Sequence, residues 1–571
     1  MASGRRISPF RCRRVFFSTP ALSARSVGEF WLLPVQSCTN TALAAELRIP
    51  PVADPLQSRN GSRSFHRLFH SSDGEDLMTG LASGFALYLC VLLVVAVITS
   101  RRNKTLPDFL LAGRKLGPWV VAFSERASGE SGWLLLGLTG LAYASGLGDP
   151  SGGEVAPALW TAVGCFCGLT LAWLLIARPL RIATEKYGAL TLPRYLEMRL
   201  GESSGRKRDP LLRIVSTAII AFCFTFYIAA QFAAAGKALS AAFGWEIWVG
   251  TVLGMGVIVL YTLMGGFLAV AWTDFIQGWL MLITLVALPL AAIGEMGGFG
   301  AVSERVGAID PELLTLSGGR SSMVLWSGII SGFAIGIGYL GQPHLAVRYM
   351  SLKSPDDVAT ARGIAVSYGL LTYGGAVLLG IAALAWFGAG HFDDPEMAMP
   401  AFAKAVFPGW LAGLLICGAL AAMMSTADSQ LLVTSSSFTE DLYHQQVDPD
   451  ASQQKLVMIG RLVTVVVGLL AFALTFYSSS SIFKKVLFAW AGLGAAFGPP
   501  MVLCLWWQGV TRNGVLAGMI SGLVTVLLWD NLDANAWLSS QVEGLRLYSL
   551  APGFLVSLAM TWGVSAFGNA K

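Results

Sequence analysis

Long apolar runs separated by short polar loops occupy the chain from about residue 78 to its end. Each run is long enough to cross a bilayer as a helix, because about 20 apolar residues span roughly 30 Å of hydrocarbon. The runs are continuous and do not alternate every second residue, so the pattern favours helices over a membrane β-barrel. We predict thirteen spans, near residues 78–100, 116–146, 155–177, 211–239, 244–266, 274–295, 321–345, 362–388, 407–433, 457–476, 484–507, 513–531 and 547–568.

Two of these spans are poor as uninterrupted helices. Span 2 contains the segment A-S-G-E-S-G-W at 127–133, with two glycines and a carboxylate at mid-membrane depth. Span 7 contains several glycines between 332 and 341, followed by Pro343. Glycine weakens a helix and proline removes one of its hydrogen bonds, so we predict a break in each span, the first at Ala127–Gly132.

The two broken spans occupy matching places in the chain. Each opens a block of five spans, namely spans 2–6 and spans 7–11, and an odd-numbered block inverts its topology relative to its copy. Paired broken helices at corresponding positions of inverted repeats mark the binding site of a secondary transporter. The alternative is a pair of ordinary kinks packed against neighbouring helices, and the matched placement argues against it.

The composition agrees with a chain that lies mostly in lipid. Apolar residues make up 54% of the 571 residues and charged residues 13%, whereas a soluble domain carries roughly 25% charged residues. We therefore predict a multi-pass protein of the plasma or inner membrane. The net charge of +5 is small and dispersed, which excludes nucleic acid as an expected partner. No obligate protein partner is evident from the sequence.

The first 77 residues differ in kind from the rest. They carry ten arginines, no lysine, many serines and no apolar run of span length. A transit peptide would be Arg- and Ser-rich, but the several acidic residues argue against one. We expect residues 1–77 to be a poorly structured extension or the product of a mis-assigned start, and residues 78–571 to form the transmembrane domain.

The distribution of lysine and arginine predicts the orientation in the membrane. The loops after the odd-numbered spans up to span 11, together with the C-terminus, carry 21 of these residues, and the opposite set carries six. Because short cytoplasmic loops are enriched in Lys and Arg, the first set is predicted to be cytoplasmic. The N-terminus is then outside and the C-terminus inside.

The break in span 2 and the middle of span 9 suggest a sodium site. Unwound backbone supplies free carbonyl groups, which coordinate sodium in transporters of this kind. Ser425 and Thr426 in span 9 can add hydroxyls, and Ala422 lies one turn earlier on the same helical face. The alternative for both hydroxyls is a hydrogen bond to a carbonyl of their own helix.

Carboxylates within the spans are the next candidates for chemistry. Glu130 is an acid inside a span and is a functional candidate by default, although it could instead accept backbone N–H groups at the break. Asp274 begins span 6, where it could cap the helix or attract a cation. Asp428 lies less than one turn beyond Thr426, and its role is left open.

Aromatic and amide side chains near the broken spans could line a solute pocket. The candidates are Trp133, Tyr227, Gln231 and Tyr339. Most aromatic residues in a membrane bundle serve packing or lie at the membrane interface, so each of the four has that alternative reading.

Several long motifs resemble the sodium/solute symporter family, and most closely its bacterial sodium/proline symporter branch. The resemblance runs from about Met78 to the C-terminus. It rests on F-L-L-A-G-R-K-L-G-P-W-V at 109–120, S-G-W-L-L-L-G at 131–137, L-Y-T-L-M-G-G-F-L-A-V-A-W-T-D at 260–274, G-Y-L-G-Q-P-H at 338–344, M-S-T-A-D-S-Q-L-L-V-T-S-S-S-F-T-E-D-L-Y at 424–443 and A-W-A-G-L-G-A-A-F-G-P at 489–499.

The resemblance implies a fold and a set of site residues. The fold would be an all-α polytopic protein with a five-plus-five inverted-repeat (LeuT-like) core, one preceding helix and two following helices. Sodium would be the co-transported ion, bound by carbonyls and hydroxyls, and Ser131 with Asp274 would match a second ion position. The implied sodium ligands are Ala127, Glu130, Ala422, Ser425 and Thr426, and the implied solute positions are Ser131, Gly132, Trp133, Tyr227 and Tyr339.

Three positions depart from the proline branch. That branch has an aspartate, important for its sodium binding, where this chain has Gly129, and here the acid is one position later at Glu130. The branch has a pocket tryptophan where this chain has Ile335, and a glycine where this chain has Gln231. A pocket that loses an indole and gains an amide could favour another small amino acid or a carboxylate over proline.

The sequence therefore predicts a sodium-coupled symporter of a small organic solute, with proline or a related amino acid as the first expectation. One alternative is proton coupling through Glu130, and another is a membrane sensor that binds solute without transporting it. An enzyme is not expected, because the loops contain no nucleophile–base pair, metal cluster or phosphate-binding loop. We accordingly assign no catalytic residue and no cofactor other than the sodium ion.

Overall fold

The computed structural model describes residues 74–100, 110–151, 153–204, 210–476 and 481–569. The predicted extension 1–77 therefore lies outside the described residues except for its last four positions, which begin the first helix. In the described residues every element is helical. The longer helices are α2 (Gly74–Ser100), α4 (Pro118–Gly132), α6 (Ala158–Ala172), α9 (Pro210–Phe243), α10 (Ile247–Met296), α12 (Ser322–Ile337), α14 (Asp357–Phe387), α16 (Gly409–Ser436), α17 (Gln453–Thr475), α18 (Ile482–Trp506), α19 (Arg512–Asn531) and α21 (Leu550–Asn569).

Shorter helices extend or connect these elements. They are η2 (Ala112–Arg114), η3 (Trp133–Leu138), α5 (Thr139–Ser145), η4 (Trp173–Ala177), α7 (Arg178–Lys186), α8 (Leu192–Ser204), α11 (Phe299–Ile309), η5 (Pro311–Leu314), η6 (Gly338–Gly341), α13 (Pro343–Ser351), η7 (Pro395–Met397), α15 (Ala398–Val406), η8 (Ser437–Val447) and α20 (Ala534–Gln541).

Eleven helices of the described part are long and apolar enough to cross a membrane. This confirms a polytopic helical protein, but the count of thirteen spans stays a prediction. The two remaining predicted spans fall on the broken run α4–η3–α5 and on the first part of α10, whose apolar stretch Ile247–Leu263 is shorter than the others.

Helix α10 folds back on itself at Gly266. This glycine has φ 57° and ψ −174°, outside the helical region. The hydroxyl of Tyr261 contacts the hydroxyl of Thr273, although twelve residues of straight helix would separate them by about 18 Å. The predicted fifth and sixth spans are therefore the two arms of one helical hairpin, joined by a turn shorter than the predicted loop.

Backbone contacts between glycines join the two halves of the core. A Cβ added to Gly168 in α6 would lie 1.9 Å from the carbonyl oxygen of Gly336 in α12. A Cβ added to Gly336 would lie 1.8 Å from the carbonyl oxygen of Gly164. Small residues allow such close approach of membrane helices, and here they bring the two helices into direct backbone contact.

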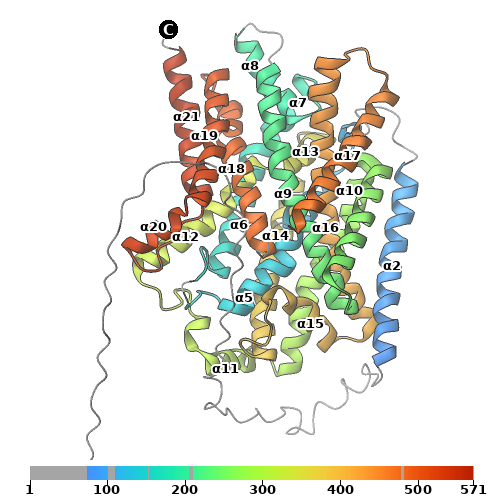
Figure 1. The fold of residues 1–571 in the computed structure, drawn as a ribbon, viewed down its shortest axis with the longest axis vertical. Coiled ribbons are helices and arrows are strands. Elements are labelled where there is room, and N and C mark those ends of the chain that lie inside the picture. Colours follow the sequence, from blue (N-terminus) through green and yellow to red (C-terminus); the bar gives the residue numbers. More distant parts are fainter. Residues whose placement is uncertain (1–73, 101–109, 152, 205–209, 477–480, 570–571) are drawn as a thin grey trace, which may run out of the picture. The chain divides into compact units, whose positions relative to one another are not determined.

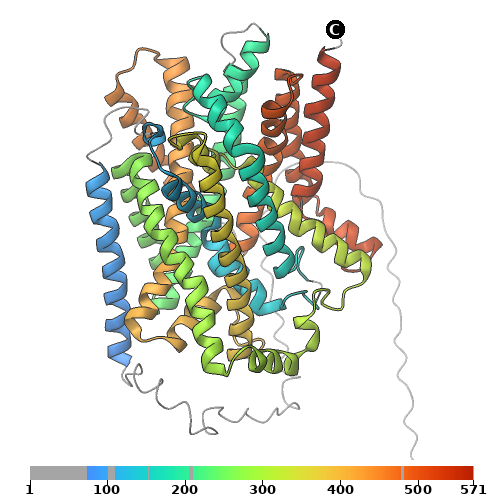
Figure 2. The same cartoon turned by 180° about the vertical axis from the view of Figure 1, so that it is seen from behind.

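The helices differ in how deeply they lie. Along its most apolar stretch, α16 with its continuation η8 has 83% of its residues buried. The corresponding buried shares in α2 and α21 are 22% and 28%. Helices α2 and α21 lie at opposite edges of the bundle in both views (Figures 1 and 2). In α4 every residue from Val120 to Gly132 is buried. The broken α4 and the central α16 therefore form the interior, where the candidate site lies.

Candidate functional site

The predicted break in span 2 is present at the end of α4. Ser131 has φ 30° and ψ −172°, which interrupts the helix within the predicted segment Ala127–Gly132. A positive φ at a non-glycine residue is strained by about 1–3 kcal/mol and persists only where the surrounding structure holds it. The helix resumes as η3 and α5, so backbone groups around Ser131 are available for contacts outside the helix.

The predicted break in span 7 is present as well. Between α12 and α13 the chain forms the short η6, followed by Gln342 in an extended conformation and by Pro343 at the start of α13. A Cβ on Gly338 would lie 2.1 Å from Nε1 of Trp490, so the break requires a residue without a side chain there. The same Nε1–H donates to the carbonyl of Ile335 at 2.8 Å and satisfies one of the freed backbone groups.

The hydroxyls of span 9 lie against the end of the first broken helix. Ser425 Oγ donates to the carbonyl of Ala127 at 2.9 Å, and Thr426 Oγ1 donates to that of Ser128 at 3.0 Å. Both hydroxyls also lie within 3.1 Å of the carbonyl oxygen of Ala422. The sequence left two possibilities for these hydroxyls, namely contact with the broken span or a hydrogen bond to their own helix. In the structure each hydroxyl makes both contacts and so bridges α16 and α4.

These contacts gather five oxygen atoms in one place: two hydroxyls and the carbonyls of Ala127, Ser128 and Ala422. Only Ser128 was missing from the predicted set. Glu130, the remaining predicted ligand, makes other contacts here: its carbonyl accepts the Trp133 N–H, and its Oε1 accepts the hydroxyl of Thr372 in α14 at 2.8 Å. The oxygen set suits a hard cation such as sodium, which prefers carbonyl and hydroxyl ligands in sites of this kind.

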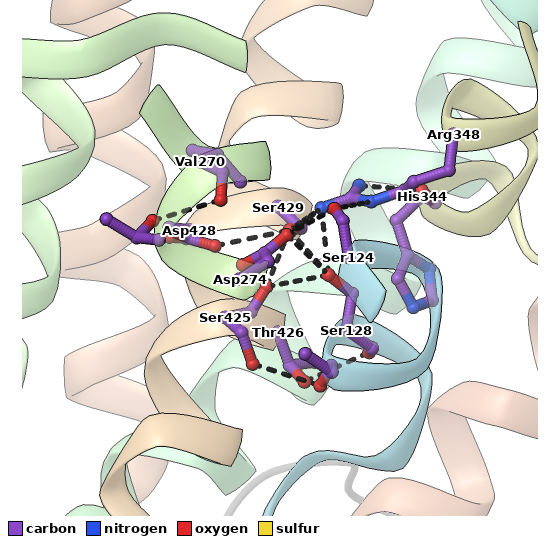
Figure 3. A network of polar contacts seen from close by, with 12 residues as sticks. Ser124, Ser128, Val270, Asp274, His344, Arg348, Ser425, Thr426, Asp428 and Ser429 are labelled. Atoms are coloured by element: carbon purple, nitrogen blue, oxygen red, sulfur yellow. Dashed lines mark hydrogen bonds and ion pairs between the residues drawn. The ribbon is translucent and has the colours of Figure 1, made fainter. Parts of the chain in front are cut away.

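A polar network continues from this oxygen cluster toward α13 (Figure 3). Asp274 Oδ2 accepts Ser124 Oγ at 2.6 Å and Arg348 Nη2 at 3.0 Å. Ser128 Oγ lies 3.3 Å from the same carboxylate oxygen and donates to the Ser425 carbonyl at 3.0 Å. The network therefore connects the two broken helices, the second arm of α10 and α16.

Asp428 lies at the edge of the same network. Its Oδ1 accepts the hydroxyl of Ser429 at 3.2 Å, and Ser429 also contacts Arg348. Among the described residues, neither Asp274 Oδ1 nor Asp428 Oδ2 has a hydrogen-bond partner, although both are buried. Arg348 pairs with Asp274 and reaches Asp428 only through Ser429, which leaves two buried carboxylate oxygens where a cation could bind. Ser131 is not part of this network, since its Oγ accepts the N–H of Trp133.

A second buried charge cluster in α4 joins Glu130 to two residues outside the predicted site, Glu125 and Arg126. Arg126 forms a bidentate pair with Glu125, at 2.7 and 2.5 Å. Its Nη1 lies 3.7 Å from Glu130 Oε1. Glu125 also accepts hydrogen bonds from Trp173 at 3.0 Å and Tyr349 at 3.2 Å. The signal in the sequence is the occurrence of three charged residues within six positions of one predicted span.

Most predicted solute positions surround the first break. The N–H of Gly132 donates to Gln231 Oε1 at 3.1 Å. Trp133 Nε1 and the Tyr339 hydroxyl both donate to the carbonyl of Gly129, at 3.3 and 3.4 Å. Gln231 Nε2 is buried and makes no hydrogen bond within the described part of the chain. This amide is therefore free to bind another polar group.

Tyr227 lies between the two broken helices and α18. Its ring contacts His344 and Trp490 edge-on, with centroid distances of 6.2 and 6.4 Å. Trp490 in turn packs edge-on against Tyr339 at 4.7 Å. The aromatic candidates from α9 and η6 therefore meet around the indole of Trp490, which the sequence did not single out as a site residue.

Gly129 faces the charge cluster. A Cβ at this position would lie 3.2 Å from Arg126 Nη2 and 3.4 Å from atoms of Tyr339 and Leu345. A larger side chain would need these neighbours to move by a few tenths of an ångström. A side chain at position 129 would therefore meet the Arg126 guanidinium and the Tyr339 ring.

A family model described as the sodium:solute symporter family matches residues 109–522. The chain is 39% identical over 482 residues to the high-affinity proline transporter PutP of Bacillus subtilis (strain 168), covering 84% of this chain and 96% of the relative. It is 37% identical over 489 residues to a sodium/proline symporter of Staphylococcus aureus, covering 84% and 91%.

A solved structure has a similar fold over most of the chain. It is a sodium-coupled sialic acid symporter in a substrate-bound, outward-open state, with a TM-score of 0.67 and 18% sequence identity, covering 86% of this chain and 98% of that one. At this identity the likeness concerns the fold, and it confirms the predicted LeuT-like transporter core.

Proposed function

The chain belongs to the sodium:solute symporter family, and from this premise we propose that it imports proline or a related small amino acid together with sodium. Members of this family are secondary transporters that take sodium as the co-transported ion. The observation that carries the proposal is the contact of the Ser425 and Thr426 hydroxyls with carbonyls of the broken α4. The curated relatives named as proline transporters support the solute.

In the proposed mechanism sodium binds between α4 and α16. Its ligands are the Ser425 and Thr426 hydroxyls with the carbonyls of Ala127, Ser128 and Ala422. The Glu130 carbonyl, which accepts the Trp133 N–H here, stays a predicted ligand. Ion binding joins the end of the first broken helix to α16 and so preforms the solute pocket beside it. Sodium and solute then raise each other's affinity by the same factor.

We propose that the solute lies beside the break of α4. Gln231 Nε2 supplies an unpaired donor, while the N–H of Gly132 already engages the same side chain. Trp133 and Tyr339 supply the apolar walls, and Ser131 and Tyr227 complete the predicted set. An amide beside the rings suits a small solute with one carboxylate and an apolar body.

A second cation position is proposed at Asp274. The unpaired oxygens of Asp274 and Asp428 support it, because both are buried near one arginine. Ser131, the other predicted member, contacts Trp133 and is better assigned to the solute side. A cation here would balance the second carboxylate.

The test is sodium-dependent uptake of labelled proline into vesicles that contain the purified protein. Replacing Ser425 and Thr426 together by alanine should raise the sodium concentration for half-maximal uptake at least about tenfold, which corresponds to roughly 1.4 kcal/mol. Thr434→Ala is the matched control, because within the described residues this buried hydroxyl of the same helix bonds only the carbonyl of Gln430. An unchanged sodium dependence in the double variant would refute the site.

Proton coupling through Glu130 remains the alternative, because Glu130 Oε2 is buried and lacks a hydrogen-bond partner among the described residues. The same vesicles separate the two mechanisms. Uptake driven by a pH gradient without sodium, and lost in Glu130→Gln, would favour the proton. Sodium-dependent uptake that survives Glu130→Gln would favour the site at Ser425 and Thr426.

We further propose that the N-terminus lies outside and the C-terminus in the cytoplasm, supported by the excess of Lys and Arg in the alternate loops.

A further inference from the structure

An apolar cavity of about 480 Å³ lies between α2, α9, α10 and α16. Among the residues that the structure describes, no charged side chain lines it, and most of its sixteen lining residues are aliphatic or aromatic. Its volume is within the range of about 300–1,000 Å³ that is common for small-molecule pockets. The cavity is separate from the proposed solute position and takes no part in the proposed transport mechanism.

The cavity lies beside a close contact between α2 and α16. A Cβ on Gly84 would lie 2.3 Å from the carbonyl oxygen of Trp410, so backbone meets backbone there. Ala82 and Ala86, on either side of Gly84 in the chain, line the cavity with small side chains, and Leu420 lies on its α16 wall. The space between the helices is therefore left unfilled by the chain itself.

The mouth of the cavity opens toward lipid. Leu89 is 36% exposed, Leu253 45% and Trp245 42%, and all three line the cavity. All four walls belong to apolar helices, three of them long enough to span the membrane and the fourth the hairpin α10. An apolar cavity does not hold water, and the apolar material at this depth is bilayer hydrocarbon.

We propose that this cavity is a binding site for one acyl chain of a membrane phospholipid. Its walls offer contact on several sides, unlike the flat lipid-facing surface of a single helix. Hydrocarbon in the cavity would restore the van der Waals contacts that its lining otherwise lacks. The proposal does not rest on the proposed transport function.

The inner wall gives this site a structural role. Tyr88 and Met424 line it, and the Tyr88 hydroxyl lies 3.5 Å from Met424 Sδ. Gln277 Nε2 donates to the same hydroxyl at 3.0 Å. Met424 directly precedes Ser425, and Gln277 follows Asp274 by three positions. An acyl chain in the cavity therefore supports the two helices that carry the candidate cation ligands.

Filling the cavity with a side chain tests the proposal. The midpoint of thermal unfolding is measured for delipidated protein in detergent, with and without added palmitoyl-oleoyl phosphatidylcholine. For the unaltered chain we expect the lipid to raise the midpoint by a few degrees. Ala86→Phe should raise the midpoint without lipid and should show a smaller rise on lipid addition, because the ring takes the place of the acyl chain.

The matched control is Leu87→Phe, which places the same ring on a residue of α2 that is 55% exposed and does not line the cavity. It should respond to lipid as the unaltered chain does. If Ala86→Phe fails to fold, Val257→Phe fills the cavity from α10. Equal lipid responses in filled and control variants would overturn the proposal and indicate surface lipid only.

A labelling experiment separates the cavity from general lipid contact. The protein is placed in nanodiscs that contain phosphatidylcholine with a photoactivatable diazirine on one acyl chain. We expect peptides that include Leu89 and Leu253 to be labelled several-fold more than peptides of α21, and Ala86→Phe to remove this excess. Uniform labelling of all lipid-facing helices would overturn the proposal.

Discussion

At the residue scale, the cluster of Glu125, Arg126 and Glu130 places two carboxylates around one guanidinium inside α4. All three side chains are fully buried. Glu125 is well satisfied by Arg126, Trp173 and Tyr349, whereas Glu130 is held mainly by Thr372. Breaking a buried ion pair by removing one partner costs about 3–5 kcal/mol, because the other charge is left uncompensated.

This cluster makes a prediction about stability. Arg126→Gln should lower the free energy of unfolding by about 3–5 kcal/mol, since it leaves two buried carboxylates unpaired. Glu130→Gln should cost less, because it keeps the ion pair between Arg126 and Glu125 and its amide oxygen can still accept the Thr372 hydroxyl. The measurement is the thermal unfolding midpoint of the purified variants. The double variant should recover part of the loss, and a purely additive loss would contradict coupling within the cluster.

At the element scale, the crossing of α6 and α12 depends on glycine. Gly336→Ala should destabilise the protein by about 1–3 kcal/mol, because overpacking forces backbone shifts, and the new Cβ would lie 1.8 Å from the carbonyl oxygen of Gly164. Gly363→Ala in α14 is the matched control, with nothing within 4 Å of its added Cβ. Thermal unfolding of the two variants is compared. Equal midpoints would show that the helices can separate without loss.

Both helix breaks could be predicted, because glycine and proline weaken a helix wherever they occur. The contact of α4 with Ser425 and Thr426 was also predicted, from the chemistry of the residue types and from the family resemblance. The pairing of Asp274 with Arg348 was not, since 74 positions separate them in the chain and nothing local marks them as partners. The sequence likewise could not show that Glu130 turns toward Thr372, because that choice depends on how α4 packs against α14.

At the scale of the whole molecule, one carboxylate joins several helices at the end of the bundle that we propose faces outside. Glu396 in η7 pairs with Lys237 of α9. It also accepts the N–H groups of Ile482 and Phe483 at the start of α18, at 3.2 and 3.1 Å. A carboxylate is favoured at a helix N-terminus, where the dipole is positive. These contacts join η7, α9 and the start of α18 at this end of the molecule.

The short helix η7 also packs closely against α5, the second half of the broken span. A Cβ on Gly140 in α5 would lie 2.9 Å from the carbonyl oxygen of Pro395, which precedes Glu396. Alternating access requires this end to open and close, so the Glu396 contacts should help set the equilibrium between the two states. A change that weakens these contacts should shift the free-energy difference between the two states toward the open state by the free energy that is lost.

Removing the carboxylate should therefore expose the interior from this side. Ala234→Cys supplies a reporter, because Ala234 is buried one turn before Lys237 and faces Gly132. With Glu396→Ala added, a membrane-impermeant thiol reagent applied to whole cells should label this cysteine several-fold faster, after subtraction of labelling at the native cysteines.

Glu312→Gln, an exposed acid of η5, is the control and should leave the rate unchanged. Equal rates with and without Glu396 would contradict a closing role. An absence of labelling in whole cells, with rapid labelling in inverted vesicles, would instead reverse the proposed orientation.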